Sequence, residues 1–291
     1  KIRVFGANEL VPPLEVFDYV SNGGAELGHS GAYYWKGKSE ACQFFSSVPF
    51  GMNAQEMNAW LYYGGGLELW SKLYSKFNLV PRPAGNTGVQ MGGWFNKLIE
   101  KTSDLKGLKM RIPGLGGEVL SRAGGVPITL AGAEIFTALQ TGTIDATEWV
   151  GPYNDRAFGL HKAAKYYYYP GWHEPGPTIE CMINKDAYNS LPDDLKFIVD
   201  MGCKAANIDM LADYTSKNNK ALKFLSSKKI IIKEFPAEIL DSLREISIEV
   251  LKEIGSTDKI TKEVYLSYIK FQEEVTPWTK LSEKSYINSR D

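Results

Sequence analysis

The sequence predicts an α/β fold. Three consecutive segments carry this prediction: residues 2–5 alternate as a strand, residues 14–21 place apolar side chains at helical spacing, and residues 25–30 form a second short strand. A strand, a helix and a strand in succession indicate a βαβ unit and a mainly parallel sheet. At 291 residues the chain can bury a substantial core, in one large or two smaller domains.

Composition excludes several classes of function. With 44% hydrophobic and 23% charged residues, the chain resembles an ordinary globular protein. A net charge of -1 gives no electrostatic footprint for nucleic acid, and no apolar run is long enough to span a bilayer. Cys42, Cys181 and Cys203 have no metal-type spacing, and their odd count predicts no disulfide framework.

An aromatic turn follows the second strand. Tyr33 and Tyr34 come directly after its C-terminal end, so by alternation we expect one ring to face a cleft and the other to point into the protein. His29, within the strand, is interpreted as a core histidine rather than a base. Helices are expected next at residues 53–64 and 67–77.

A glycine-rich stretch then holds three polar side chains that could bind a ligand. Asn86, Thr87 and Gln90 lie among glycines and aromatics, where the backbone can approach a ligand and amides can orient it. The glycines do not form a nucleotide motif, because the third glycine of G-x-G-x-x-G is missing and no G-K-[ST] occurs. A helix is expected at residues 92–100.

A short strand at residues 108–112 is stopped by Pro113-Gly114, which places Arg111 at a strand end. Ligand sites of α/β folds usually lie there, and a guanidinium suits bidentate capture of a carboxylate. A helix beginning near residue 116 would add the positive end of its dipole. The alternative is an ordinary surface arginine.

Two glutamates occupy comparable positions further along the chain. A strand that reaches Glu148 ends at Gly151-Pro152, and Glu174 lies in the Gly/Pro-rich turn at residues 170–177. Together with the amide oxygen of Gln90, two carboxylates form a plausible shell for Ca²⁺ or Na⁺. The alternative is that these loop carboxylates are simply solvated.

The remaining segments show regular helical and strand patterns. A strand at 126–130, a helix at 132–139, and strands at 166–169, 178–184 and 228–233 are expected, with helices at 191–226, 236–254 and 261–276. The helix at 191–226 carries apolar residues at helical spacing, among them Ile198, Met201 and Ile208, as expected of a buried spine across both domains. Pro277 is expected to end the last helix.

Three motifs, at residues 85–95, 108–114 and 145–154, closely resemble the periplasmic solute-binding subunits of TRAP (tripartite ATP-independent periplasmic) transporters. Within that family they are most similar to the branch that binds α-keto acids, and the resemblance runs from Lys1 to Asp291. It implies a two-domain binding protein, with a ligand cleft between two lobes, strands that cross between the domains and a long spine helix.

The resemblance also implies roles for individual residues. It assigns Gln90, Glu148, Glu174 and the backbone carbonyl of Trp149 to a bridging Na⁺ or Ca²⁺, and it gives a ligand-contacting tyrosine the position of Tyr34. The residues predicted to bind the substrate are Tyr34, Asn86, Gln90, Arg111, Trp149 and Asn154.

The expected division of the chain is residues 1–87 with 177–226 in one domain, and 88–176 with 227–291, including the C-terminal helices, in the other. Family members carry a strand and a helix before the position of Lys1, so a native N-terminus with its signal is expected to precede this sequence. The resemblance further implies a periplasmic location, TRAP membrane subunits as partners, and pairing of two copies through residues 261–276.

The predicted function is capture of a small 2-oxo monocarboxylate, such as pyruvate, with a bridging cation. One alternative is a 2-hydroxy acid such as lactate with Ca²⁺. Another is a metal-dependent lyase or hydrolase with Glu148 or Glu174 as general base, although no G-x-S-x-G or H-E-x-x-H motif occurs. A third is an interaction module without a ligand.

Overall fold

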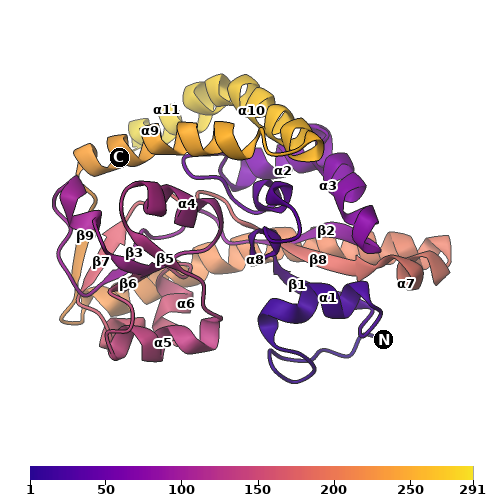
Figure 1. Cartoon of the computed structure of the whole chain (residues 1–291), viewed down its shortest axis with the longest axis horizontal. Helices are drawn as coiled ribbons and strands as arrows, with labels where there is room; N and C mark the ends of the chain where they lie inside the picture. The colour runs from indigo at the N-terminus through magenta and orange to yellow at the C-terminus, as the bar shows by residue number, and fades with distance from the viewer. Residues whose placement is uncertain (291) are drawn as a thin grey trace.

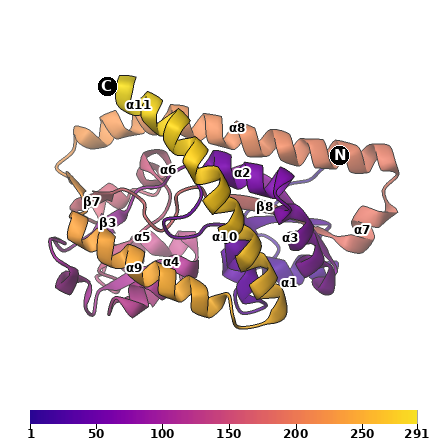
Figure 2. The same ribbon diagram turned by 90° about the horizontal axis from the view of Figure 1, so that it is seen from above.

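The structure is a computed structural model that describes residues 1–290. It forms two α/β lobes that lie side by side, with α9 (Ala237–Ile254) and α10 (Lys259–Thr279) above them (Figure 1). The long helix α8 (Asp193–Ser226) runs along the molecule and packs against elements of both lobes (Figure 2). The predicted α/β class and spine helix are confirmed.

Lobe I is built on a three-stranded sheet, the smaller of the two sheets within residues 1–290. Its strands are β1 (Leu27–Gly31), β8 (Thr178–Asn184) and β2 (Leu79–Asn86), in that order, and β8 is antiparallel to both neighbours. The predicted βαβ unit is therefore wrong. Residues 2–5 are irregular, with Ile2 68% and Val4 86% exposed, because β propensity holds a segment only where a partner strand completes the ladder.

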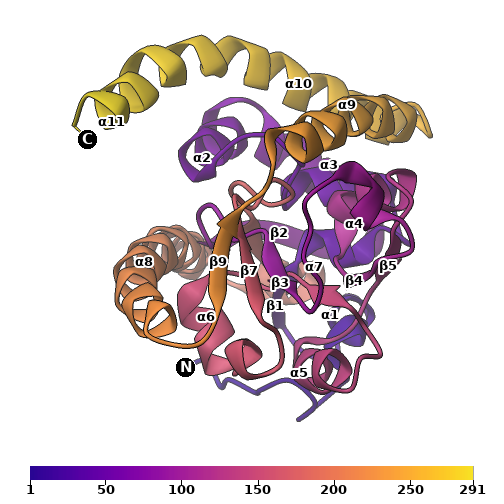
Figure 3. The same cartoon turned by 90° about the vertical axis from the view of Figure 1, so that its left-hand side faces the viewer.

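Lobe II is built on a six-stranded mixed sheet, counted over the described part of the chain. In spatial order its strands are β5 (Val126–Ile128), β4 (Lys109–Arg111), β6 (Ala146–Thr147), β3 (Gly93–Phe95), β7 (Tyr166–Tyr169) and β9 (Ile231–Glu234). Parallel pairing joins β4 to β5 and β6, and β7 to β9, while β3 is antiparallel to β6 and β7. Figure 3 shows this sheet edge with α8 on one side and α10 arching above.

The helix predicted at residues 92–100 is wrong, since this segment supplies β3. Trp94 stacks on Tyr167 of β7 with ring centroids 3.9 Å apart, and both side chains are fully buried. Two glycines and a bulky aromatic pair favour an extended strand between β6 and β7 over an isolated helix.

The other helices largely follow the sequence pattern. They are α1 (Val16–Ser21), α2 (Ala54–Tyr63), α3 (Gly66–Tyr74), α4 (Gly114–Arg122), α5 (Gly132–Gln140), α6 (Pro152–Ala157), α7 (Lys185–Ser190) and α11 (Ser285–Arg290). None of the helices in residues 1–290 has both the length and the apolar character needed to cross a membrane.

The buried face of α8 differs from the prediction. Ile198 and Ile208 are 61% and 67% exposed, whereas Cys203 and Asn207 are buried. Helical spacing identifies a stripe but does not decide which stripe meets the sheet. Here the stripe that packs against β2 and β8 contains small and polar residues, because the two backbones approach closely.

The C-terminal helix α10 continues through Pro277, so the predicted stop is also wrong. Tertiary contacts hold the helix across the hydrogen bond that proline removes. Tyr268 is fully buried and its hydroxyl accepts a hydrogen bond from Met52 N at 2.9 Å, while Thr279 donates to Glu56. These contacts place α10 against α2 and α3 of lobe I, although the sequence assigned the C-terminal helices to the other domain.

A carboxyl group is buried inside lobe I. Glu180, on the central strand β8, is fully buried and accepts a hydrogen bond from Trp35 Nε1 at 2.5 Å, with Tyr74 beside it. Burial raises the pKa of Glu180 to about 8, although the neighbouring Trp35 and Tyr74 side chains lower it. The native lobe therefore holds this group as a neutral acid at pH 7.

We expect this acid to make stability depend on pH. Its native pKa lies above its unfolded value, so its contribution is complete below about pH 4.5 and is lost as pH rises through about 8. At about 1.4 kcal/mol per pKa unit, the free energy of unfolding should fall by about 3–5 kcal/mol over this range. Glu180→Gln, which mimics the neutral acid, should remove that slope when urea unfolding is measured at several pH values. A variant with the same pH slope as the parent protein would contradict the assignment.

Candidate functional site

Arg111 lies at the end of β4, as predicted, but it is a buried residue with a 1% exposed side chain. Its Nη1 donates to Glu148, its Nη2 donates to the Tyr34 hydroxyl at 2.7 Å, and its Nε donates to Leu130 O at 3.3 Å. Burial lowers the pKa of Arg111, but Tyr34 and Glu148 more than offset this and raise it above the usual value. The surface-arginine alternative is therefore excluded.

Tyr34 connects the two lobes at this point. It belongs to the short helix η2 (Ala32–Trp35) of lobe I, whereas Arg111 belongs to lobe II. Tyr33 packs against Tyr34 with ring centroids 4.6 Å apart and also lies beside Gly114, at the start of α4. Burial raises the pKa of Tyr33 well above its ordinary value, and the charges of Glu174 and Glu148 add to this. Both rings therefore face the site, where alternation predicted one.

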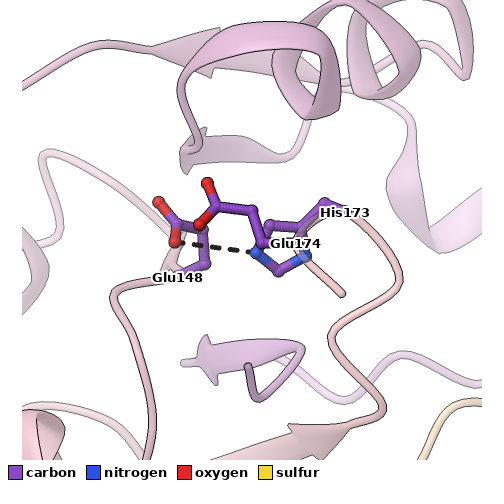
Figure 4. A group of neighbouring side chains, drawn as sticks. All are labelled: Glu148, His173 and Glu174. Atoms are coloured by element: carbon purple, nitrogen blue, oxygen red, sulfur yellow. Dashed lines mark ion pairs between the residues drawn. The ribbon is translucent and has the colours of Figure 1, made fainter. Parts of the chain in front are cut away.

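Two glutamates and a histidine form a buried cluster next to Arg111. Glu148, His173 and Glu174 each offer one ligand atom, and these atoms lie within 4.8 Å of one another (Figure 4). The side chains are 1%, 1% and 3% exposed, and His173 Nε2 is 3.6 Å from Glu148 Oε2. Burial and the charge of Glu148 raise the pKa of Glu174 well above its usual range, against the opposing effects of Arg111 and Gln90.

Several polar atoms of this cluster are unsatisfied. Within residues 1–290, Gln90 Oε1, Glu174 Oε2 and both ring nitrogens of His173 are buried without a hydrogen-bond partner. Gln90 reaches the cluster because its backbone N donates to Glu174 O at 3.1 Å, and its Nε2 donates to Thr87 Oγ1 at 3.3 Å. Buried polar groups normally find partners, so these atoms fit a ligand or an ion that supplies them.

The other predicted residues lie around this cluster in different ways. Trp149 stacks on Phe158 at 4.8 Å, and the Arg111 guanidinium lies 5.2 Å from its ring centroid. The side chain of Asn86 is used within the protein, because it donates to Gly176 O at 3.0 Å and accepts from Gly88 N at 2.9 Å. Asn154, on α6, donates to Tyr214 of α8 at 3.2 Å. Direct ligand contacts of Asn86 and Asn154 stay predictions.

Asp155 fixes the turn that carries Glu148 and Trp149. It is 1% exposed and accepts hydrogen bonds from Val150 N at 3.1 Å, Trp94 Nε1 at 2.9 Å and Tyr167 OH at 2.7 Å. Burial raises the pKa of Asp155 to about 6, while its three donors lower it. The turn is therefore tied to β3 and β7 by one carboxylate.

Gly93 lets β3 pass beneath Glu148. Its φ is +118°, and a Cβ atom there would lie 2.6 Å from Thr147 O and 3.3 Å from Glu148 Cα. The glycine-rich stretch was expected to let the backbone approach a ligand, but at this position it lets one strand approach another. The close approach keeps Glu148 in line with Arg111.

Sequence reasoning missed Tyr33 and His173. Tyr33 is adjacent to Tyr34 and His173 is adjacent to Glu174, so the predicted neighbour of each could have indicated that it lies near the site. A short 3-10 helix and a Gly/Pro-rich turn bring both members of each pair to the site, which strand alternation does not anticipate.

Taken together, the geometry is that of a buried cluster of one guanidinium, two carboxyl groups and a histidine, with unsatisfied polar atoms, lying where the two lobes meet. The family model of the family 7 bacterial extracellular solute-binding proteins (DctP) matches residues 1–258. The chain belongs to this family. It is thus a solute-binding protein of the TRAP type and not an enzyme, which removes the lyase or hydrolase alternative.

Relatives support this assignment over nearly the whole chain. A monocarboxylate 2-oxoacid-binding periplasmic protein from Nostoc sp. is 48% identical over 288 residues, which cover 99% of this chain and 79% of that protein. A TRAP solute-binding protein from Pseudoalteromonas atlantica, with bound sodium and pyruvate, is 46% identical. Its structure superposes with a TM-score of 0.92 and covers 95% of this chain and 84% of its own.

A third relative has a similar fold with a different ligand. The TRAP solute-binding protein from Bordetella bronchiseptica is 40% identical, with a TM-score of 0.98 over 100% of this chain and 86% of its own. It is a mixed-occupancy dimer with calcium and picolinate in one active site and an apo second site. The two-lobed fold of the TRAP solute-binding proteins is therefore established for this chain.

We expect Gly93→Ala to destabilise the protein by about 3 kcal/mol, through positive-φ strain and a clash with the Thr147 carbonyl. The matched control is Gly107→Ala. Gly107 also has a positive φ, +69°, but among the described residues no atom lies within 4 Å of an added Cβ, so strain alone should cost about 1 kcal/mol. Urea unfolding measures both, and equal losses would contradict the close approach of β3.

Proposed function

We propose that this chain is the receptor that captures a small 2-oxo monocarboxylate for a TRAP transporter, together with a bridging cation. The observation that carries the proposal is the buried cluster of Arg111, Glu148 and Glu174, with unsatisfied acceptor atoms beside the guanidinium. Similar proteins bind pyruvate with sodium or are named for 2-oxo acids, which agrees with this chemistry.

Arg111 is the proposed anchor for the ligand's carboxylate. A guanidinium has five N–H donors, and contacts to Glu148, Tyr34 and Leu130 use three of them. The remaining donors are available to an acid that enters between the lobes. The Tyr34 hydroxyl lies at the same guanidinium, so the acid would also contact the lobe I side of the site.

Gln90, Glu148, Glu174 and the Trp149 carbonyl are proposed to hold the cation. Na⁺ and Ca²⁺ take oxygen ligands, and the first three residues present oxygen atoms to one buried space. His173 supplies nitrogen, which such cations disfavour, so we assign its ring to the bound acid, whose oxygen atoms can accept from an imidazole N–H. The cation supplies positive charge and orients the acid's oxygen atoms.

Charge balance supports the need for a cation. Two carboxylates and an incoming anionic acid face one guanidinium, and each close contact between like charges costs about 4 kcal/mol at 4 Å with an effective dielectric near 20. Within the protein, burial and then the charge of Glu148 raise the pKa of Glu174 well above its usual range, so the two carboxylates already repel each other. A bound cation removes this repulsion.

The lobes are proposed to divide the chain as residues 1–87 with 177–226, and 88–176 with 227–291. The strands of the smaller sheet all fall within the first of these two parts, and the strands of the larger sheet within the second. The helix α10 is an exception, because it belongs to the second part of the chain but packs on lobe I. Closure of two such lobes on a ligand is a hinge motion. The proposed location is the periplasm, and the proposed partners are the membrane subunits of the transporter.

Pairing of two copies through the C-terminal helices is a further part of this proposal. Leu266 and Trp278 on α10 are 53% and 69% exposed, and Leu281 beyond it is 75% exposed. Exposed apolar side chains on one helical segment fit an interface. The Bordetella bronchiseptica relative is recorded as a dimer.

We expect Arg111→Lys to weaken pyruvate binding about tenfold to a hundredfold, because lysine keeps the charge but loses the planar fork. Arg82→Lys is the matched control: Arg82 is a part-buried arginine paired with Asp200 at 2.7 Å, far from the acid site. Titration calorimetry measures both variants. Affinity that is unchanged in Arg111→Lys, or reduced equally in the control, would remove Arg111 from the ligand site.

We also expect binding of the acid to require a cation. Protein stripped with a chelator and exchanged into a salt without Na⁺ should bind pyruvate weakly, and Ca²⁺ or Na⁺ should restore the affinity. Glu174→Gln should lower affinity for ion and acid together, whereas Glu180→Gln, the same change at a buried carboxyl of lobe I, should not.

Full affinity for pyruvate in the stripped protein would argue against the bridging ion while leaving the carboxylate site intact. The same titrations with lactate and with branched 2-oxo acids identify the preferred acid. A higher affinity for lactate, dependent on Ca²⁺, would establish the 2-hydroxy acid alternative.

A further inference from the structure

Two of the three cysteines come together in lobe I, far from the acid site. Cys181 lies at the middle of β8 and Cys203 lies on the buried face of α8, where this helix packs against the sheet. Both side chains line the same groove between the sheet and α8, and each thiol perturbs the pKa of the other. Cys42, the third cysteine, is fully buried elsewhere in the core of lobe I, and all three are free thiols in this structure.

The surroundings of the pair distinguish its two sulfur atoms. His29 on β1 and Arg82 on β2 lie directly opposite Cys181 in the sheet register, so these side chains share one face with it. The neighbouring Cys181 lowers the pKa of Cys203, burial opposes this, and the charge of Arg82 lowers it further. Cys203, together with burial, raises the pKa of Cys181. Cys203 is the thiol with more thiolate character.

Small molecules can reach the pair from the surface. Both cysteines line an apolar groove of about 770 Å³ between the sheet and α8. Cys203 also lines a second cavity of about 420 Å³ on the other side of the helix, together with Arg82 and Asp200. A buried structural cysteine such as Cys42 has no comparable access, since its side chain is fully enclosed among residues 1–290.

We propose that Cys181 and Cys203 form a reversible dithiol–disulfide pair, which on oxidation joins β8 to α8. This inference does not depend on the identity of the captured acid. The oxidant is a disulfide, of a small molecule or of a thiol–disulfide oxidoreductase. The Cys203 thiolate attacks one sulfur of that disulfide, forms a mixed disulfide and releases the first thiolate, which takes up a proton.

The second step closes the bond within the protein. Cys181 gives its proton to solvent, and its sulfur attacks the Cys203 sulfur of the mixed disulfide and releases the second thiol. The two protein thiols have then lost two protons and two electrons, and the oxidant has been reduced to two thiols. The new bond fixes α8 on β8, the central strand of lobe I.

Oxidised glutathione is the probe for this proposal. The reduced protein is treated with it, quenched in acid, unfolded and alkylated with N-ethylmaleimide, and its peptides are mapped by mass spectrometry. We expect alkylation at Cys42 alone, together with a peptide pair joined through Cys181 and Cys203. Dithiothreitol should reverse the change. The loop enclosed by the bond has about 20 residues, so the oxidised protein should melt about 5 °C higher than the reduced protein.

Two variants complete the experiment. Cys42→Ser should form the same bond, whereas Cys203→Ser should form none and should show no rise of Tm with oxidised glutathione. Alkylation of all three cysteines after oxidation, or stable glutathione on Cys203 with Cys181 still free, would overturn the proposal. Both of these results are measured on the unsubstituted protein, so the proposal remains falsifiable even if a variant fails to fold.

Discussion

The ion pair between Arg111 and Glu148 is the interaction on which the rest of the structure depends. Both side chains are 1% exposed, and a buried charge is tolerated only where partners are fixed in place. Parallel pairing of β4 with β6 aligns the two strand ends, and Glu148 N donates to Arg111 O at 3.2 Å. Gly93 and Asp155 then hold the strand and the turn behind Glu148. The sheet of lobe II thus holds the Arg111 and Glu148 side chains in position for their ion pair.

Placing this pair at the border between the lobes links binding to closure. Tyr34 of lobe I accepts a hydrogen bond from a guanidinium that belongs to lobe II. The second carboxyl group, Glu174, leaves the site short of positive charge, and the proposed acid with its cation would correct the balance. Closure of the lobes excludes water from these groups, which strengthens each electrostatic contact. A site without charged groups would gain less electrostatic energy from closure of the lobes around an ion and an acid.

How much of this could be predicted depended on local signals. The positions of Arg111 and Glu148 at strand ends were predictable because Pro113-Gly114 and Gly151-Pro152 end these strands in the sequence itself. Tyr33 and His173 were missed because irregular turns, not strand alternation, aim them. The prediction of a buried apolar stripe on α8 and of a strand at residues 2–5 was wrong, because periodicity and propensity do not show which surface a segment packs against. The proximity of Cys181 to Cys203 is a tertiary fact with no trace in their spacing.

The two lobes also differ in how they hold their ionisable groups. Lobe II gathers Arg111, Glu148 and Glu174 at one border, where a ligand can complete their pairing. Lobe I keeps Glu180 neutral between aromatic rings in its interior, away from any ligand. A carboxyl that stays protonated contributes shape and hydrogen bonding without drawing an ion into the core. The charged groups of the candidate site thus belong to lobe II, and lobe I contributes the η2 tyrosines, of which Tyr34 accepts a hydrogen bond from the Arg111 guanidinium.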